Sequence, residues 1–253
     1  MTLRQLLPAS QDSPGLTEAG LAALYAYPDG RWLRANMVSS ADGAATLAGA
    51  SAGLSSDTDR RLFALLRTLS DVILVGAATV RTERYKPARP APEPWRGLRA
   101  GRTPTPPIAV VTRRLDLDPD SPLISAAPAD ARTIVITTER APADIKAALE
   151  PRADVIIAGD EGVDFKAAVA ALAERGHRRL LAEGGPHLLG ELLAAGLLDE
   201  LCLTTGPLLA GPGPSRIVTG NLGSASALPL DLAHVLAEDG FLFCRYTRKN
   251  HDY

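Results

Sequence analysis

Strand-like and helix-like segments alternate through the middle of this chain. Apolar runs at Ile108–Thr112, Thr133–Thr137, Val155–Ala158 and Arg179–Glu183 are interleaved with stretches of helical spacing near Ala143–Leu149, Phe165–Arg175 and His187–Ala195. Because neighbouring parallel strands need crossover connections, usually helices, this order predicts a parallel core sheet with helices on its faces. Two earlier apolar runs, Arg31–Ser40 and Asp71–Gly76, are expected in the same sheet.

After Asp199 the pattern changes to strand-like runs without helices between them. These runs are Glu200–Gly206, Arg216–Val218, Leu232–Ala237 and Phe241–Thr247, and Glu238-Asp239-Gly240 predicts a hairpin between the last two. No linker divides the chain. We therefore expect a single α/β domain over residues 1–253, with a mixed, mostly parallel sheet, flanking helices and a C-terminal antiparallel hairpin.

Two segments lie outside the alternating pattern. Residues 1–28 are expected to form an N-terminal arm with a short helix around Leu16 to Tyr25. Residues 81–107 are rich in proline and predict a long loop, which is either a lid or binding loop or a tolerated insertion.

The composition excludes several function classes. A formal net charge of −2 over 253 residues gives no general affinity for polyanions, so we expect a small-molecule substrate and no nucleic acid. The cysteines, Cys202 and Cys244, are expected as buried free thiols, and no Cys-x-x-Cys or His-x-Glu pattern of a zinc deaminase occurs. No apolar run has the length of a membrane span and no secretion signal is recognisable, which predicts a cytoplasmic protein without a membrane partner.

Four turns that follow predicted strands contain residues suited to binding or catalysis. They are Asp42-Gly43, Gly76 to Thr79, Thr112-Arg113-Arg114, and Glu183-Gly184-Gly185. The carboxyl ends of parallel strands meet at one sheet edge, where α/β proteins place their ligands. Helix N-termini after glycines favour a diphosphate, and paired arginines favour a 2′-phosphate, so the set indicates NADPH. Each turn also has a structural explanation: an Asp-Gly reversal, close packing, or a solvated basic loop.

The same motifs occur in a recognisable order. They are Asn36-Met37 through Ser40-x-Asp42-Gly43, Asp71 to Val80, Glu183-Gly184-Gly185, Leu197-x-Asp199-Glu200, and Gly206 to Leu209 with Gly211 and Gly213. Together they resemble the reductase domain of the bifunctional riboflavin-biosynthesis deaminase/reductase, over about residues 30 to 247. The resemblance implies a dihydrofolate-reductase-like fold, a homodimer and, without a deaminase half, a stand-alone pyrimidine reductase.

The resemblance also implies an activity and a site. The activity is NADPH-dependent reduction of a ribosylamino-pyrimidine phosphate to its ribitylamino form. The cofactor contacts carried over are Gly76, Thr79, Val80, Gly184 and Gly185, while Asp42 and Glu183 border the nicotinamide and substrate. The substrate side comprises Asn36 and Ser40, with Ser51, Ser55 and Arg67 at positions that hold the substrate phosphate. Ser55 as a helix cap and Arg67 as a surface charge are the alternatives.

Two departures from the family pattern lie on the substrate side. Ala44 replaces a basic residue after the Asp-Gly pair, and Arg81 to Arg89 lacks the paired aspartates of the family. They leave open a dihydrofolate or pteridine reductase, in which Asp59, one helical turn before Phe63, faces the pteridine. Helix capping explains Asp59 equally well. A non-catalytic NADP-binding protein is the third possibility.

Overall fold

We describe a computed structural model of residues 3–8, 15–220 and 227–249. Ten strands of this part of the chain are β1 (Arg4–Leu7), β2 (Trp32–Ser40), β3 (Val72–Gly76), β4 (Ile108–Val111), β5 (Ile134–Thr137), β6 (Asp154–Ile157), β7 (Arg179–Ala182), β8 (Glu200–Gly206), β9 (Leu230–Glu238) and β10 (Phe241–Arg248). They form one sheet in the order β1-β9-β10-β8-β2-β7-β3-β4-β5-β6. The first four strands in this order, β1, β9, β10 and β8, pair antiparallel. From β8 onward, through β2, β7, β3, β4, β5 and β6, every neighbouring pair is parallel. The expected mixed sheet is confirmed.

The C-terminal hairpin forms where the sequence predicts it. β9 and β10 pair antiparallel, and the turn residues Asp239 and Gly240 both have positive φ, at 50° and 82°. That backbone matches the twist of the flanking strands, and Asp-Gly adopts it readily. The strand expected at Arg216–Val218 is wrong: the segment is irregular, because Ile217 and Val218 pack onto the core from a loop rather than pair with a neighbour.

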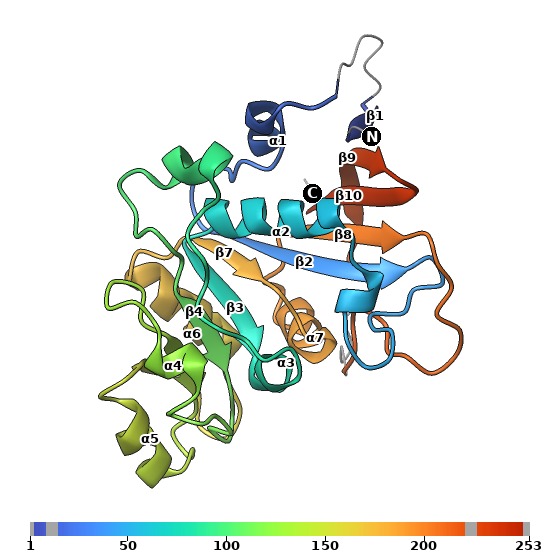
Figure 1. The fold of residues 1–253 in the computed structure, drawn as a ribbon. Helices are drawn as coiled ribbons and strands as arrows, with labels where there is room; N and C mark the ends of the chain where they lie inside the picture. The colour runs from blue at the N-terminus through green and yellow to red at the C-terminus, as the bar shows by residue number, and fades with distance from the viewer. Residues whose placement is uncertain (1–2, 9–14, 221–226, 250–253) are drawn as a thin grey trace.

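Helices cover both faces of the sheet (Figure 1). They are α1 (Glu18–Leu24), α2 (Asp57–Leu69), α3 (Ala77–Thr82), α4 (Pro122–Ser125), α5 (Ala143–Leu149), α6 (Phe165–Glu174) and α7 (Pro186–Ala194), with 3-10 turns η1 (Ala52–Leu54) and η2 (Glu93–Arg99). None of the helices in these described ranges is long and apolar enough to cross a membrane.

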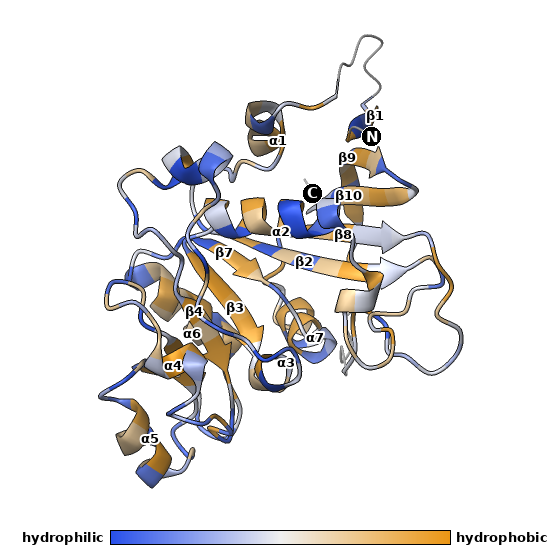
Figure 2. Ribbon diagram, viewed as in Figure 1, coloured by the Kyte–Doolittle hydropathy of each residue, from blue (hydrophilic) through white to orange (hydrophobic). Residues whose placement is uncertain are grey.

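The pleat of β3 shows how the layers are divided. Leu74 packs on one face with Leu172 of α6 and Leu192 of α7, whereas Val75 packs on the other face with Val80 of α3. Successive side chains of a strand point to opposite faces, so a strand that is apolar at every position must be covered on both. Figure 2 shows β3 and β4 as hydrophobic along their length, as this burial requires.

The proline-rich segment is tied to the body of the protein. η2 interrupts it, and Trp95 is buried against the leucines of α2. Arg99 donates to the carbonyl oxygens of Thr68 and Ser70, at the end of α2, at 3.0 and 2.7 Å. These are carbonyl groups that a helix terminus leaves unpaired. Residues 81–107 are therefore a docked connection that contains a seven-residue 3-10 helix, not a structureless loop.

A buried ionic group joins three strands of the sheet. Glu200 on β8 accepts from Arg34 on β2 at 2.6 Å and from Arg245 on β10 at 2.9 Å. The side chains of Arg34 and Glu200 are fully buried. Burial alone would raise the pKa of Glu200, but the charges and hydrogen bonds of the two arginines outweigh it and hold the pKa at about 2. Nearby Cys202 is a buried free thiol, and Cys244 is free but only half-buried.

We predict that Glu200→Gln lowers the free energy of unfolding by about 3–5 kcal/mol at neutral pH, because it leaves two guanidinium groups without their carboxylate. The folded pKa of Glu200 lies below its ordinary value, so its contribution is present above about pH 4.5 and is lost as the pH falls towards 2. Urea unfolding at several pH values should show the free energies of unfolding of wild type and Glu200→Gln converging as the pH is lowered. Glu150→Gln, at an exposed position, is the control; an equal loss there would contradict the prediction.

Candidate functional site

Two adjoining cavities open at the carboxyl ends of the parallel strands. The first has a volume of about 440 Å³ and the second of about 810 Å³. Four residues line both cavities: Ala78, Thr79, Gly185 and Pro186. The two spaces therefore meet between the start of α3 and the turn after β7.

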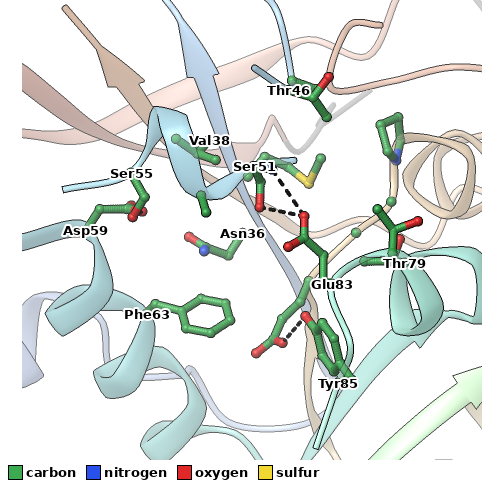
Figure 3. Close-up of a pocket in the computed structure, with 18 of the residues that line it drawn as sticks. Asn36, Val38, Thr46, Ser51, Ser55, Asp59, Phe63, Thr79, Glu83 and Tyr85 are labelled. Carbon is green, nitrogen blue, oxygen red and sulfur yellow. Dashed lines mark hydrogen bonds between the residues drawn. The ribbon is translucent and has the colours of Figure 1, made fainter. Parts of the chain in front are cut away.

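The first cavity lies between α2, β2 and the start of α3. Its predicted lining residues are Asn36, Ser51, Ser55, Asp59, Thr79, Glu183, Gly184 and Gly185. Figure 3 shows Ser55, Asp59 and Phe63 on one side, Thr79 on the opposite side and Asn36 between them. Met37 and Val38 add apolar surface from β2. The cavity thus combines an apolar wall with a few polar groups, as small-molecule sites do.

The second cavity collects the residues expected around a phosphorylated cofactor. Of the predicted set it contains Gly76, Thr79, Thr112, Arg113, Arg114 and Gly185. Arg113 and Arg114 are exposed, and neither forms an ion pair with any residue that the structure describes. α7 begins here without a side-chain cap, so its first N–H groups are open to an anion.

The glycine turn between the cavities has a steric reason. Gly184 has a φ of +103°, which side chains rarely allow. A Cβ at Gly185 would lie 2.7 Å from Oγ1 of Thr79. The turn after β7 therefore touches α3 with no room for a side chain, and this contact fixes the boundary between the cavities.

Glu183 is held by three donors. Its oxygens accept from Nε and a terminal nitrogen of Arg67, both at 2.6 Å, and from the hydroxyl of Tyr85 at 2.9 Å. The Glu183 side chain is fully buried, and the Arg67 guanidinium lies 4.3 Å from the centre of the Phe63 ring. Burial, and then the charge of Glu183, raise the pKa of Tyr85 well above its ordinary value, so its hydroxyl keeps its proton. Arg67, expected at a substrate phosphate, instead neutralises Glu183 and lines neither cavity.

Asp42 also lies outside the lining of both cavities. Its carboxylate accepts from the Ser40 hydroxyl and from the N–H groups of Ala210 and Gly211, at 3.1 and 2.9 Å. These bonds, that of Ser40 first, lower the pKa of Asp42 to about 2. Asp42 and Ser40 thus fasten the loop after β8 to the turn after β2. Val80, expected at the cofactor, is buried in the core.

Three predicted substrate-side residues bind partners within the chain. Ser51 donates its N–H and hydroxyl to Glu83, at 3.1 and 3.0 Å, which places a carboxylate where a substrate phosphate is expected. Ser55 donates to Asp59 at 2.6 Å. The cap of α2 is Ser56 rather than Ser55, because the Ser56 hydroxyl accepts the N–H of Asp59.

Several lining residues are not predicted from the sequence. They include Thr46, Glu83 and Tyr85 in the first cavity, and His187, Ser215 and Thr219 in the second. Glu83 and Tyr85 lie in the segment Arg81 to Arg89, which departs from the family pattern. That departure is the sequence signal that could have pointed to them. Ser215 and Thr219 belong to an irregular segment, and nothing local marks them.

We predict that Arg67→Ala lowers the free energy of unfolding by about 3–5 kcal/mol, because Glu183 is left buried and unpaired. The double variant Arg67→Ala with Glu183→Ala should be less unstable than the sum of the single variants, as urea unfolding of the four proteins will measure. Arg140→Ala removes exposed ion pairs and should cost less than about 1 kcal/mol. Additive losses in the double variant would show that the pair is not coupled.

Comparison with known proteins identifies relatives of this chain. A model of the RibD C-terminal domain matches residues 31–240. The 2,5-diamino-6-ribosylamino-4(3H)-pyrimidinone 5′-phosphate reductase of Methanothermobacter thermautotrophicus is 30% identical over 225 residues, which is 85% of this chain and 96% of that protein.

Solved structures agree on the fold. A pyrimidine reductase-like protein from Corynebacterium diphtheriae has a TM-score of 0.81 at 28% identity, covering 91% of this chain and 98% of its own. The Thermotoga maritima diaminohydroxyphosphoribosylaminopyrimidine deaminase/5-amino-6-(5-phosphoribosylamino)uracil reductase has a TM-score of 0.65 at 20% identity, covering 87% of this chain and 57% of its own. The family model spans most of the chain, both cavities included. The chain therefore belongs to the RibD C-terminal domain family.

Proposed function

We propose that this protein is an NADPH-dependent reductase that converts a ribosylamino-pyrimidine 5′-phosphate to its ribitylamino form in riboflavin biosynthesis. The observation that carries the proposal is the pair of cavities that meet at Thr79 and Gly185. One offers polar groups and an apolar wall to a pyrimidine, and the other offers open helix N–H groups and two arginines to a phosphorylated carrier. The names of the relatives support the same reaction.

The second cavity fits the cofactor by the chemistry of its donors. The first N–H groups of α7 suit the diphosphate, since a helix N-terminus favours an anion. Arg113 and Arg114 suit the 2′-phosphate, because a guanidinium presents a fork of donors to phosphate oxygens. When bound, NADPH would supply a hydride to C1′ of the ring-opened imine, with a proton added to the imine nitrogen and NADP⁺ left as the product.

The chain's own residues then act by orientation and exclusion of water. Met37, Val38 and Phe63 give the first cavity an apolar wall, which favours a dry site. Glu183 serves as a positioning residue, because its side chain is fully buried and its carboxylate is bonded to Arg67 and Tyr85. Asp42 serves likewise, by holding the loop after β8. The homodimer and the cytoplasmic location expected from the sequence stay predictions.

A second candidate, reduction of dihydrofolate or another pteridine, is favoured by one observation. Asp59 and Phe63 both line the first cavity, as the pteridine-reductase alternative requires. The pterin ring of dihydrofolate carries the same 2-amino-4-oxo pyrimidine edge as the diaminopyrimidinone named in the relatives. The names of those relatives support the phosphorylated pyrimidine, which we therefore prefer as the substrate.

We predict that the purified protein consumes NADPH when given 2,5-diamino-6-ribosylamino-4(3H)-pyrimidinone 5′-phosphate, as followed by NADPH absorbance and by identification of the ribitylamino product. Dihydrofolate is assayed in parallel. Turnover of dihydrofolate alone would replace the proposed function by the second candidate. Tight NADPH binding with neither turnover would favour a non-catalytic NADP-binding protein.

We predict a preference for NADPH over NADH that depends on Arg113 and Arg114. Replacing both by alanine should weaken NADPH binding by roughly 1.5–3 kcal/mol for each charged hydrogen bond lost and leave NADH binding nearly unchanged. Calorimetric titration measures both affinities. The matched control replaces Arg175 and Arg178, which are exposed beyond the opposite end of β7. An NADPH affinity unaltered by the Arg113 and Arg114 changes would remove these residues from the cofactor site.

A further inference from the structure

We propose that Asp59 is a specificity-determining residue that recognises the 2-amino and N3–H edge of the substrate ring and so selects a 2-aminopyrimidin-4-one over the corresponding uracil. The inference rests on the proposed function and deepens it. It concerns one face of the first cavity, where Asp59 stands in the first turn of α2.

Asp59 is a buried carboxylate with a fixed orientation. It is only 8% exposed, and it is among the residues that line the first cavity. Oδ1 accepts from the Thr204 hydroxyl of β8 at 2.6 Å, and Oδ2 accepts from the Ser55 hydroxyl at 2.6 Å. Each oxygen thus accepts one strong hydrogen bond, whereas a carboxylate oxygen can accept about two. Capacity for one further hydrogen bond therefore remains on each oxygen.

The neighbours of Asp59 suit a flat heterocycle. Phe63 follows one helical turn later and lines the same cavity, with Asn36 and Val38 of β2 across from it (Figure 3). No cation pairs with Asp59 among the residues that the structure describes. A buried carboxylate that lacks a cationic partner gains from a ligand that brings two N–H donors.

The two pyrimidines named among the relatives differ at this edge. A 2-amino-4(3H)-pyrimidinone presents the N3–H and the 2-amino group side by side, across the ring from the ribosylamino group. Both are donors, and they match the two oxygens of a carboxylate. A uracil presents N3–H beside the C2 carbonyl, so one carboxylate oxygen would face another acceptor. Sites built to bind a particular N–H reject the analogue that lacks it, because a buried polar group is left unpaired.

The test compares the two pyrimidines with wild type and Asp59→Asn. Wild type should show a kcat/KM at least about 100-fold higher for the 2-amino substrate than for 5-amino-6-ribosylaminouracil 5′-phosphate. An asparagine offers one donor and one acceptor, which match the uracil edge. Asp59→Asn should therefore lower the preference by on the order of 10- to 100-fold, through loss with the first substrate and gain with the second.

The control is Asp144→Asn, in the first turn of α5. Its side chain is exposed, and the change removes the same charge near a helix N-terminus at a residue that lines neither cavity. It should leave the preference unchanged. An equal fall in activity on both pyrimidines in Asp59→Asn would mean that Asp59 only holds Ser55 and Thr204, and would overturn the inference.

Two further measurements distinguish a failure of the proposed function from a failure of the inference about Asp59. Calorimetric affinities for the two ribitylamino products test the edge recognition without turnover, so they decide the case even where Asp59→Asn is inactive. If wild type reduces neither pyrimidine, the proposed function fails, while the binding preference still tests Asp59. If Asp59→Asn does not fold, Thr204→Val should lower the preference several-fold by freeing the carboxylate, and a preference kept in full would contradict the inference.

Discussion

The buried carboxylate of Glu183 ties together three parts of the chain that form the site. Arg67 brings α2 to it, Tyr85 brings the proline-rich segment, and Glu183 itself ends β7 and leads into the glycine turn. A carboxylate without exposure is tolerable only when its charge is paired and its oxygens are bonded, and here both conditions are met. The position of the first cavity's walls thus depends on one ionic contact.

The parallel part of the sheet explains why two cavities meet at one edge. The neighbouring strands β2, β7, β3 and β4 end at the same side, and their following turns supply lining residues to one or both cavities. The contact between Thr79 and Gly185 separates the spaces without closing either. A carrier in one and a substrate in the other would have their reacting ends near that contact, which is what a hydride transfer requires.

Much of this architecture follows from local sequence patterns. Apolar runs with helical stretches between them predict β4 to β7, and Asp239-Gly240 predicts the hairpin, because both signals arise from near neighbours. β1 is not predicted, since its four mostly exposed residues carry no periodic signal and are placed in the sheet by pairing with β9. Ile217 and Val218 mislead for the opposite reason: apolar residues pack equally well from a loop.

The site residues also fall into those that local sequence marks and those that depend on distant contacts. Glycines and arginines that follow strands mark the second cavity, whereas the partners of Glu183 and Asp59 come from distant positions. Arg67 lies 116 residues from Glu183, and Thr204 lies 145 residues from Asp59. Such pairs are set by tertiary packing. Sequence alone therefore gives Arg67 as a phosphate ligand or a surface charge, and Asp59 as a pteridine-facing carboxylate or a capping group, without the partner of either.

A crystal structure of the protein with NADP⁺ and the ribitylamino product would show whether the two cavities hold the carrier and the substrate. We expect the 2′-phosphate at Arg113 and Arg114, the nicotinamide at the Thr79–Gly185 contact, and the pyrimidine between Phe63 and Asn36. A dinucleotide bound away from the second cavity, or a pyrimidine outside the first, would contradict this expectation.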